Sequence, residues 1–337
     1  MLLSMNNNVS EYRSNSMAEV EAAGFTCSGA KQMLRTAGDP EKCFRQDPLG
    51  ILQGIRFGMQ LGLPVDPATE KAMFSQAYRM DNLAGEQVFA ELCKLLPLMK
   101  GEDLIRFAPI LAAVIPELKP MIGFDQRSPH HGYDLFTHVA YVVSGVPGDL
   151  VLRWAALLHD IGKVPTFTVD ETGRGHFANH AARGAEMADA ILRRLKAPDA
   201  LRRQVVLLVD KHMLWLQPEK NALRRQIGQL GIGTVYQILS LQHADNTNKG
   251  TAKSGETELY VKVLDVLEEI RSEDGYFSLK DLTVKGDDLM QIGFTGRTIG
   301  IMLNWLLDQV VQENLPNERR VLLDWAQRVW TDVWQNS

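Results

Sequence analysis

His159 and Asp160 are neighbours in an apolar stretch of the chain, residues 157–163. Both side chains lose hydration when they are buried, so an apolar helix can carry the pair only where something compensates the loss. A divalent metal ion compensates both, because a neutral imidazole and a carboxylate are ordinary ligands of such ions. The pair therefore predicts a metal site.

Further residues of these types lie at wide spacing around the pair, and all eight histidines fall between His130 and His243. The predicted metal ligands are His138, His159, Asp160, His180, His212 and Asp245. His180 and His212 would complete a position for a second ion, and the other four would hold the first. Taken singly, a histidine on an apolar helix is usually a satisfied core or surface residue. Mixed imidazole and carboxylate ligands favour one or two ions of Mn, Fe, Co, Ni or Zn.

The order of these residues resembles the HD superfamily of metal-dependent phosphohydrolases. The resemblance implies hydrolysis of phosphomonoesters and 2′,3′-cyclic phosphates, with a nucleotide or an RNA-end phosphate as substrate. The ion would activate a water molecule and polarise a phosphoryl oxygen. The predicted catalytic residues are Asp160, as a bridge between two ions, and Lys163, one turn later, as a contact to a phosphate oxygen. The alternative for Lys163 is a solvated lysine at a helix C-terminus.

Three other stretches are similar to a second family. Residues 37–57 resemble the neck of bacterial CCA-adding enzymes (tRNA nucleotidyltransferases) and their poly(A) polymerase relatives, and residues 282–290 and 315–319 resemble the tail of that family. The similarity covers about residues 35–325 and implies tRNA as a partner.

The catalytic head of that family is not recognisable in the sequence. It carries an Asp-x-Asp pair, and residues 1–100 contain none, although transfer by two metal ions needs carboxylates to hold them. Gly50 stands where the family has an arginine that pairs with a base together with the aspartate matched by Asp47. Asp47 followed by Pro48 could instead be a helix N-cap. The sequence therefore predicts neck, HD body and tail without the head, and no nucleotide addition.

The predicted function is accordingly that of a metal-dependent phosphohydrolase. Two alternatives remain: an RNA-binding or tRNA-holding subunit of a split tRNA nucleotidyltransferase, and an HD fold with vestigial ligands. Retention of all six candidate ligands argues against the second alternative.

Apolar residues recur at helical spacing throughout, for example Met302, Leu306 and Val310, whereas alternating β-branched runs are nearly absent. The sequence predicts an all-α fold: a multi-helix HD-domain bundle with helical neck and tail subdomains. The expected parts are a loose N-terminal segment (1–34), a neck-like region (35–125), an HD metal-binding domain (126–250) and a C-terminal tail (251–337).

Composition narrows the setting of the protein. Three widely spaced cysteines exclude a disulfide framework and suit a reducing compartment. No apolar run approaches the length of a membrane span, and residues 1–30 lack the layout of a signal peptide. We therefore expect a cytoplasmic protein with no membrane partner, and the sequence is also compatible with a homodimer.

Overall fold

The computed structural model describes residues 18–28, 32–129, 132–250, 256–272, 279–311 and 314–330. The chain divides into two compact units. The first comprises residues 1–213 and 244–252, and the second comprises residues 214–243 and 253–337. The boundaries of these two units differ from those of the four parts expected from the sequence. The four-part division stays a prediction.

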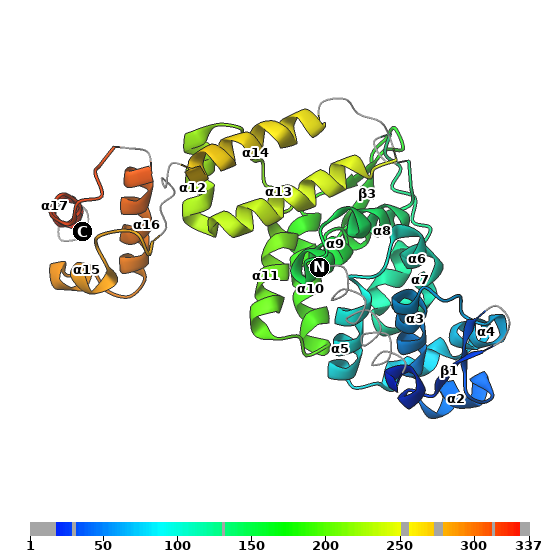
Figure 1. Ribbon diagram of the computed structural model, residues 1–337. Coiled ribbons are helices and arrows are strands. Elements are labelled where there is room, and N and C mark those ends of the chain that lie inside the picture. Colours follow the sequence, from blue (N-terminus) through cyan, green and yellow to red (C-terminus); the bar gives the residue numbers. More distant parts are fainter. Residues whose placement is uncertain are drawn as a thin grey trace, which may run out of the picture. The chain divides into compact units, whose positions relative to one another are not determined.

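Helices make up most of the first unit (Figure 1). In chain order they are α2 (Pro40–Gln46), α3 (Gly50–Leu61), α4 (Pro67–Gln76), η1 (Ala77–Asn82), α5 (Gly85–Leu95), α6 (Gly101–Arg106), α7 (Ala108–Val114), η2 (Pro116–Met121), α8 (Leu135–Gly145), α9 (Leu150–Leu158), η3 (Val164–Thr166), α10 (His180–Arg194) and α11 (Asp199–Lys211). The mainly helical fold predicted from the sequence is confirmed.

Aspartate side chains fix where several of these helices begin. Asp134 accepts hydrogen bonds from the backbone N–H groups at the start of α8, and Asp149 accepts one from Leu152 N at 2.9 Å at the start of α9. Such caps satisfy donors that have no partner inside the helix. Asp47 differs from the expected N-cap: it ends α2, and its carboxylate accepts from Leu49 N at 3.1 Å in the turn before α3.

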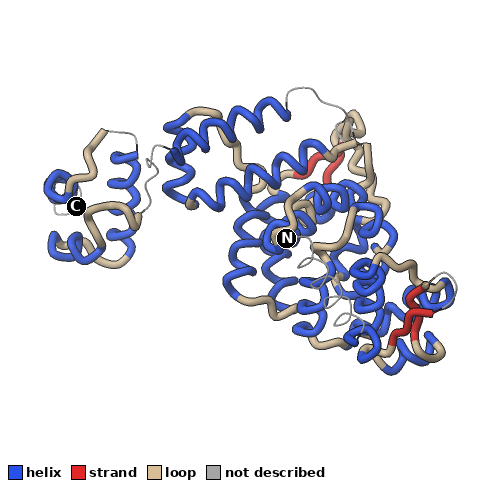
Figure 2. Tube along the Cα trace, viewed as in Figure 1, coloured by secondary structure: helices blue, strands red, loops and turns tan. Residues whose placement is uncertain are grey.

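Two short antiparallel hairpins interrupt the helical pattern (Figure 2), so the strict all-α prediction needs correction. Strands β1 (Phe25–Ser28) and β2 (Met33–Thr36) pair with Phe25 opposite Thr36. Strand β1 lies within the segment expected to be loose, residues 1–34, and β2 crosses its end. Strands β3 (Phe167–Val169) and β4 (Gly175–Phe177) pair with Thr168 opposite His176. Strands of three or four residues are too short to show an alternating pattern in the sequence.

The core of the first unit lies around α8 and α9, which pack against each other. Val139, Val143, Trp154 and Leu157 on these helices are fully buried. Helix α11 packs on α9 and along α10. Polar residues just after α9, His159 and Asp160, are buried in this closely packed setting.

The second unit contains α12 (Lys220–Leu230), most of α13 (Ile232–Thr247), α14 (Glu256–Ser272), α15 (Gly286–Ile292), α16 (Arg297–Val311) and α17 (Arg319–Val329). Helices α15, α16 and α17 share a buried core that includes Leu289, Met302, Leu306 and Leu322. The apolar stripe predicted from Met302, Leu306 and Val310 is thus the buried face of α16.

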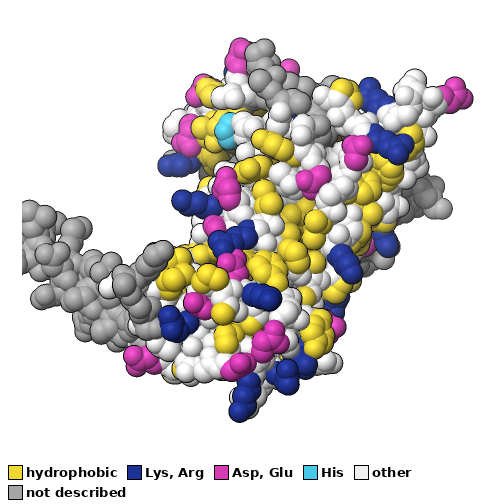
Figure 3. Space-filling model, turned by 90° about the vertical axis from the view of Figure 1, so that its right-hand side faces the viewer, with side chains coloured by type: hydrophobic (Ala, Val, Ile, Leu, Met, Phe, Trp, Pro, Cys, Tyr) yellow, Lys and Arg dark blue, Asp and Glu magenta, His cyan; other side chains and the backbone are white. Residues whose placement is uncertain are grey.

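Acidic and basic side chains are scattered over the face of the molecule shown in Figure 3, with apolar side chains between them. Among the residues that the structure describes, no helix combines the length and apolar character that a membrane span requires.

Candidate metal centre

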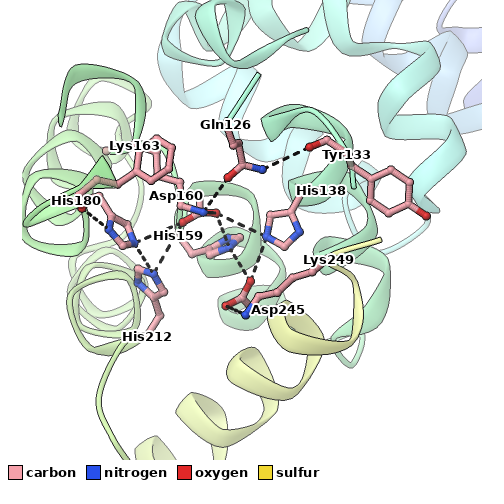
Figure 4. Close-up of polar contacts among 12 residues, drawn as sticks. Gln126, Tyr133, His138, His159, Asp160, Lys163, His180, His212, Asp245 and Lys249 are labelled. Carbon is pink, nitrogen blue, oxygen red and sulfur yellow. Dashed lines mark hydrogen bonds and ion pairs between the residues drawn. The ribbon is translucent and has the colours of Figure 1, made fainter. Parts of the chain in front are cut away.

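The six predicted ligands converge inside the first unit (Figure 4). Each comes from an end or a turn of a different part of the chain: His138 lies on α8, His159 and Asp160 follow α9, His180 begins α10, His212 follows α11, and Asp245 lies in the last turns of α13. All six predicted positions are therefore brought together, although 107 positions in the sequence separate His138 from Asp245.

Gly162 allows α10 to approach the turn after α9. A Cβ atom at this position would lie 2.1 Å from the carbonyl oxygen of His180 and 2.5 Å from the backbone nitrogen of Gly184. No side chain fits there, so glycine lets His180 reach the neighbourhood of Asp160.

A second backbone contact holds Asp245 beside His138. Gly132 N donates to the carbonyl oxygen of Lys249 at 2.7 Å, and Gly250 has a positive φ of 71°. A Cβ at Gly250 would lie 2.7 Å from the ring of Tyr133. The segment after α13 is thereby closely packed against the segment before α8.

Hydrogen bonds fix the tautomers of the four clustered histidines. Each Nδ1 contacts a backbone carbonyl oxygen: His138 that of Asn248 (2.9 Å), His159 that of Ala156 (2.8 Å), His180 that of Phe177 (2.9 Å) and His212 that of Val209 (2.7 Å). A carbonyl oxygen only accepts, so Nδ1 carries the proton in each ring. In the neutral imidazole the Nε2 lone pair is then available to a metal ion.

The first group of donor atoms has the spacing of a metal shell. His138 Nε2 lies 3.0 Å from Asp245 Oδ1, and Asp160 Oδ2 lies 3.3 Å from His159 Nε2 and 3.5 Å from His138 Nε2. Two donor atoms bound to one ion at about 2.1 Å are about 3.0 Å apart in octahedral geometry and about 3.4 Å apart in tetrahedral geometry. The buried His159 Nε2 has no hydrogen-bond partner among the described residues. These residues fit a divalent ion.

The second group shares Asp160. Its Oδ1 lies 3.6 Å from His180 Nε2 and 3.9 Å from His212 Nε2, and the two Nε2 atoms are 3.2 Å apart. With both Nδ1 atoms protonated, two neutral rings would direct their lone pairs at each other. A cation between them removes that repulsion, so this group also fits a metal ion.

The charges of the cluster favour a cation. Burial alone would raise the pKa of Asp160, but His159 and Lys163 outweigh it and hold that pKa well below its usual range. Burial would lower the pKa of His159, yet Asp160 and Asp245 raise it. Burial, reinforced by His159, lowers the pKa of His212 to about 4, so its ring is neutral at pH 7. The same carboxylates would attract a divalent ion.

Lys163 is not the solvated lysine of the alternative interpretation. Its side chain is buried, and its Nζ lies 2.7 Å from Asp160 Oδ2 and 3.0 Å from Gln126 Oε1. Lys249 Nζ lies 3.9 Å from Asp245 Oδ2. Gln126 and Lys249 were not predicted from the sequence. The spacing of four residues between Asp245 and Lys249 was a usable signal, although Lys249 lies just after the end of α13, whereas Gln126 had none.

The other histidines lie elsewhere or outside the described residues. His176 contacts Asp170 at 2.6 Å at the β3–β4 hairpin, and His243 stacks on Tyr260 with ring centroids 4.0 Å apart. His130 and His131 fall outside the described residues.

The sequence is similar to those of known tRNA nucleotidyltransferases. The family described as "tRNA nucleotidyltransferase domain 2 putative" matches residues 178–326. The A-adding tRNA nucleotidyltransferase of Deinococcus radiodurans is 30% identical over 316 residues, which cover 88% of this chain and 72% of that protein. The CC-adding tRNA nucleotidyltransferase of Thermus thermophilus is 33% identical over 233 residues, 64% of this chain and 53% of that protein.

A solved structure shows the same fold. The Bacillus stearothermophilus CCA-adding enzyme in complex with CTP superposes with a TM-score of 0.58 at 18% identity. The superposition covers 91% of this chain and 68% of that enzyme. Because residues 35–337 make up less than 91% of the chain, the superposed part also includes residues before residue 35.

These findings correct the classification made from the sequence. The HD phosphohydrolase assignment is wrong, because the relatives that match most of the chain are nucleotidyltransferases. The description of the chain as a fragment that resembles the family only in neck, body and tail is also wrong, since the similarity covers 88% of this chain and 72% of the A-adding relative. The alternative of a tRNA-holding subunit without its own catalytic head is therefore also wrong. The chain belongs to the tRNA nucleotidyltransferase family, whose reaction is a transfer and not a hydrolysis.

Proposed function

We propose that this protein is a cytoplasmic tRNA nucleotidyltransferase that adds nucleotides to the 3′ end of tRNA. The observation that carries the proposal is the 30% identity to an A-adding enzyme over 72% of that enzyme's length. The match to the A-adding relative covers more of this chain than the match to the CC-adding relative, 88% against 64%, which favours ATP as the nucleotide substrate. The three free cysteines support a reducing compartment.

The proposal includes a divalent transition metal in the His/Asp cluster. His138, His159, Asp160 and Asp245 would hold one ion, and His180 and His212 would hold a second together with Asp160, the bridging carboxylate. A bound ion would supply a concentrated positive charge that can bind an oxygen of an anionic ligand. The support is the Nε2 lone pairs and carboxylate oxygens that face one another at ligand spacing.

Adenylate transfer is tested with tRNA that ends in CC. The purified protein is incubated with this tRNA, labelled ATP and either magnesium or manganese. We expect label in tRNA ending in CC and none in tRNA that already ends in CCA. An absence of label, while an established A-adding enzyme labels the same tRNA, would overturn the proposed activity.

Metal content is tested separately, because the cluster is not assigned a step in the transfer. Elemental analysis after reconstitution should find one to two transition-metal ions per chain. His159→Ala and Asp160→Ala should lose most of the metal, since each removes a ligand. His176→Ala is the matched control, because His176 is exposed on the β3–β4 hairpin and its Nε2 pairs with Asp170, which is not a proposed ligand. Equal metal in all four proteins would place the site elsewhere.

A further inference from the structure

Lys163 is buried beside the proposed metal ligands but is not one of them. It is 7% exposed, and its ammonium contacts Asp160 Oδ2, Gln126 Oε1 and the face of Phe177, whose centroid is 5.4 Å away. A lysine ordinarily keeps its charged end in water. Here Asp160 supplies the only negative charge within ion-pair distance of the ammonium among the described residues, so the pair explains its burial.

The ammonium contacts the oxygen that the first metal ion would use. Asp160 Oδ2 lies 2.7 Å from Lys163 Nζ and also faces His138 Nε2 and His159 Nε2 at 3.5 and 3.3 Å. An ion bound to this oxygen at about 2.1 Å would lie within about 5 Å of the ammonium. Like charges at that separation repel strongly where little water screens them.

Two lysines balance the two carboxylates of the cluster. Lys163 is paired with Asp160, while Lys249 lies farther from Asp245, at 3.9 Å, and also donates to Asn246. These four groups sum to no net charge, so a divalent ion would leave the cluster with excess positive charge. Because Lys163 lies closer to its carboxylate than Lys249 does, it must have the larger effect on the binding of the ion.

We propose that Lys163 is the internal counter-ion of the cluster: it neutralises Asp160 when no ion is bound and lowers the affinity of the cluster for divalent ions. The inference rests on the proposed metal site. It makes Lys163 a residue that sets metal affinity, and it accounts for a buried cation that the ligand set does not use.

A lysine that orients Asp160 for metal binding, and so raises the metal affinity, would also donate a hydrogen bond to Asp160. Hydrogen bonds from neighbouring groups orient metal ligands, and their loss typically weakens metal binding about 10–100-fold. Lys163→Gln keeps an N–H donor without the charge, and Lys163→Met removes both. A counter-ion predicts tighter binding in both variants, whereas an orienting donor predicts weaker binding in Lys163→Met and nearly unchanged binding in Lys163→Gln.

The test is a titration of metal-free protein with Co²⁺, followed by visible absorption, which reports the ligand shell directly. Lys163→Gln and Lys163→Met should bind Co²⁺ at least tenfold more tightly than the wild type. Lys163→Arg, which keeps the charge, should bind no more tightly than the wild type. Lys262→Met is the matched control, because Lys262 is an exposed, ion-paired lysine of the second unit and should leave the affinity unchanged.

Each outcome decides the proposal. Gln and Met variants that bind Co²⁺ less than tenfold more tightly than the wild type, or more weakly, would overturn the counter-ion role while leaving the metal site intact. Co²⁺ binding by Lys163→Gln but not by the wild type would support the role, and binding by neither would overturn it together with the metal site. If Lys163→Met does not fold, the comparison of the Gln and Arg variants decides, because it isolates the charge.

Discussion

Gly162→Ala tests whether the close approach of α10 to the turn after α9 builds the proposed metal centre. The added Cβ would lie 2.1 Å from His180 O, and real Cβ atoms essentially never come within 3.0 Å of such an atom, so the start of α10 must move by about 1 Å. Overpacking costs about 1–3 kcal/mol, and the upper end applies because the obstacle is backbone, which no rotamer change relieves.

The expected loss of about 3 kcal/mol corresponds to a fall in Tm of about 6–12 °C for a unit of this size. The shift also moves His180 away from Asp160, so Co²⁺ affinity should fall at least tenfold, or about 1.4 kcal/mol. Urea unfolding and Co²⁺ titration measure the two effects.

Two glycines serve as controls. A Cβ at Gly148 meets nothing within 4 Å, so Gly148→Ala should change stability by less than about 0.5 kcal/mol. Gly184→Ala should fall between the two, because its closest neighbour is a side-chain atom, Val209 Cγ1 at 3.3 Å. Wild-type stability and Co²⁺ affinity in Gly162→Ala would refute the reasoning.

Other contacts lead to three more predictions. Gly250→Ala should lower the free energy of unfolding by about 1–3 kcal/mol in urea and weaken Co²⁺ binding, because its positive φ and the Tyr133 ring exclude a Cβ beside Asp245; an unchanged variant would contradict this. Arg56→Met should lower the free energy of unfolding by about 3–5 kcal/mol, because Arg56 is the buried partner of Glu91, which is 3% exposed. A loss below about 1 kcal/mol would show that Glu91 needs no cation. Removal of bound metal with a chelator should lower the Tm. The loss corresponds to about 2.7 kcal/mol if the free ion had been present at 100 times its Kd. In Asp160→Asn the Tm should be the same with and without the chelator.

The clustering of the proposed metal ligands could be anticipated because these residue types are unusual in apolar helices. His159 and Asp160 needed compensation wherever they were buried, and the structure supplies it at ligand spacing. The burial of Lys163 was not predictable, because it depends on Gln126 and Phe177, which are distant in sequence or carry no periodic signal.

The helical architecture was predictable from period-3.6 stripes such as Met302, Leu306 and Val310, which are buried on α16. The β1–β2 hairpin was not, since register in strands of four residues depends on tertiary partners such as the bridge between Leu34 and Val65. The activity was misassigned because the same His and Asp order occurs in proteins with different reactions, and a fold or a ligand set does not by itself specify which bond is made or broken.

The most direct measurement of the proposed activity is the mass of the 3′-terminal fragment of tRNA ending in CC, after incubation with this protein and ATP. The proposed activity predicts that the fragment gains one adenylate and that no gain occurs with tRNA ending in CCA. A fragment of unchanged mass, beside a control enzyme that adds the adenylate to the same tRNA, would contradict the proposed addition of adenylate by this protein.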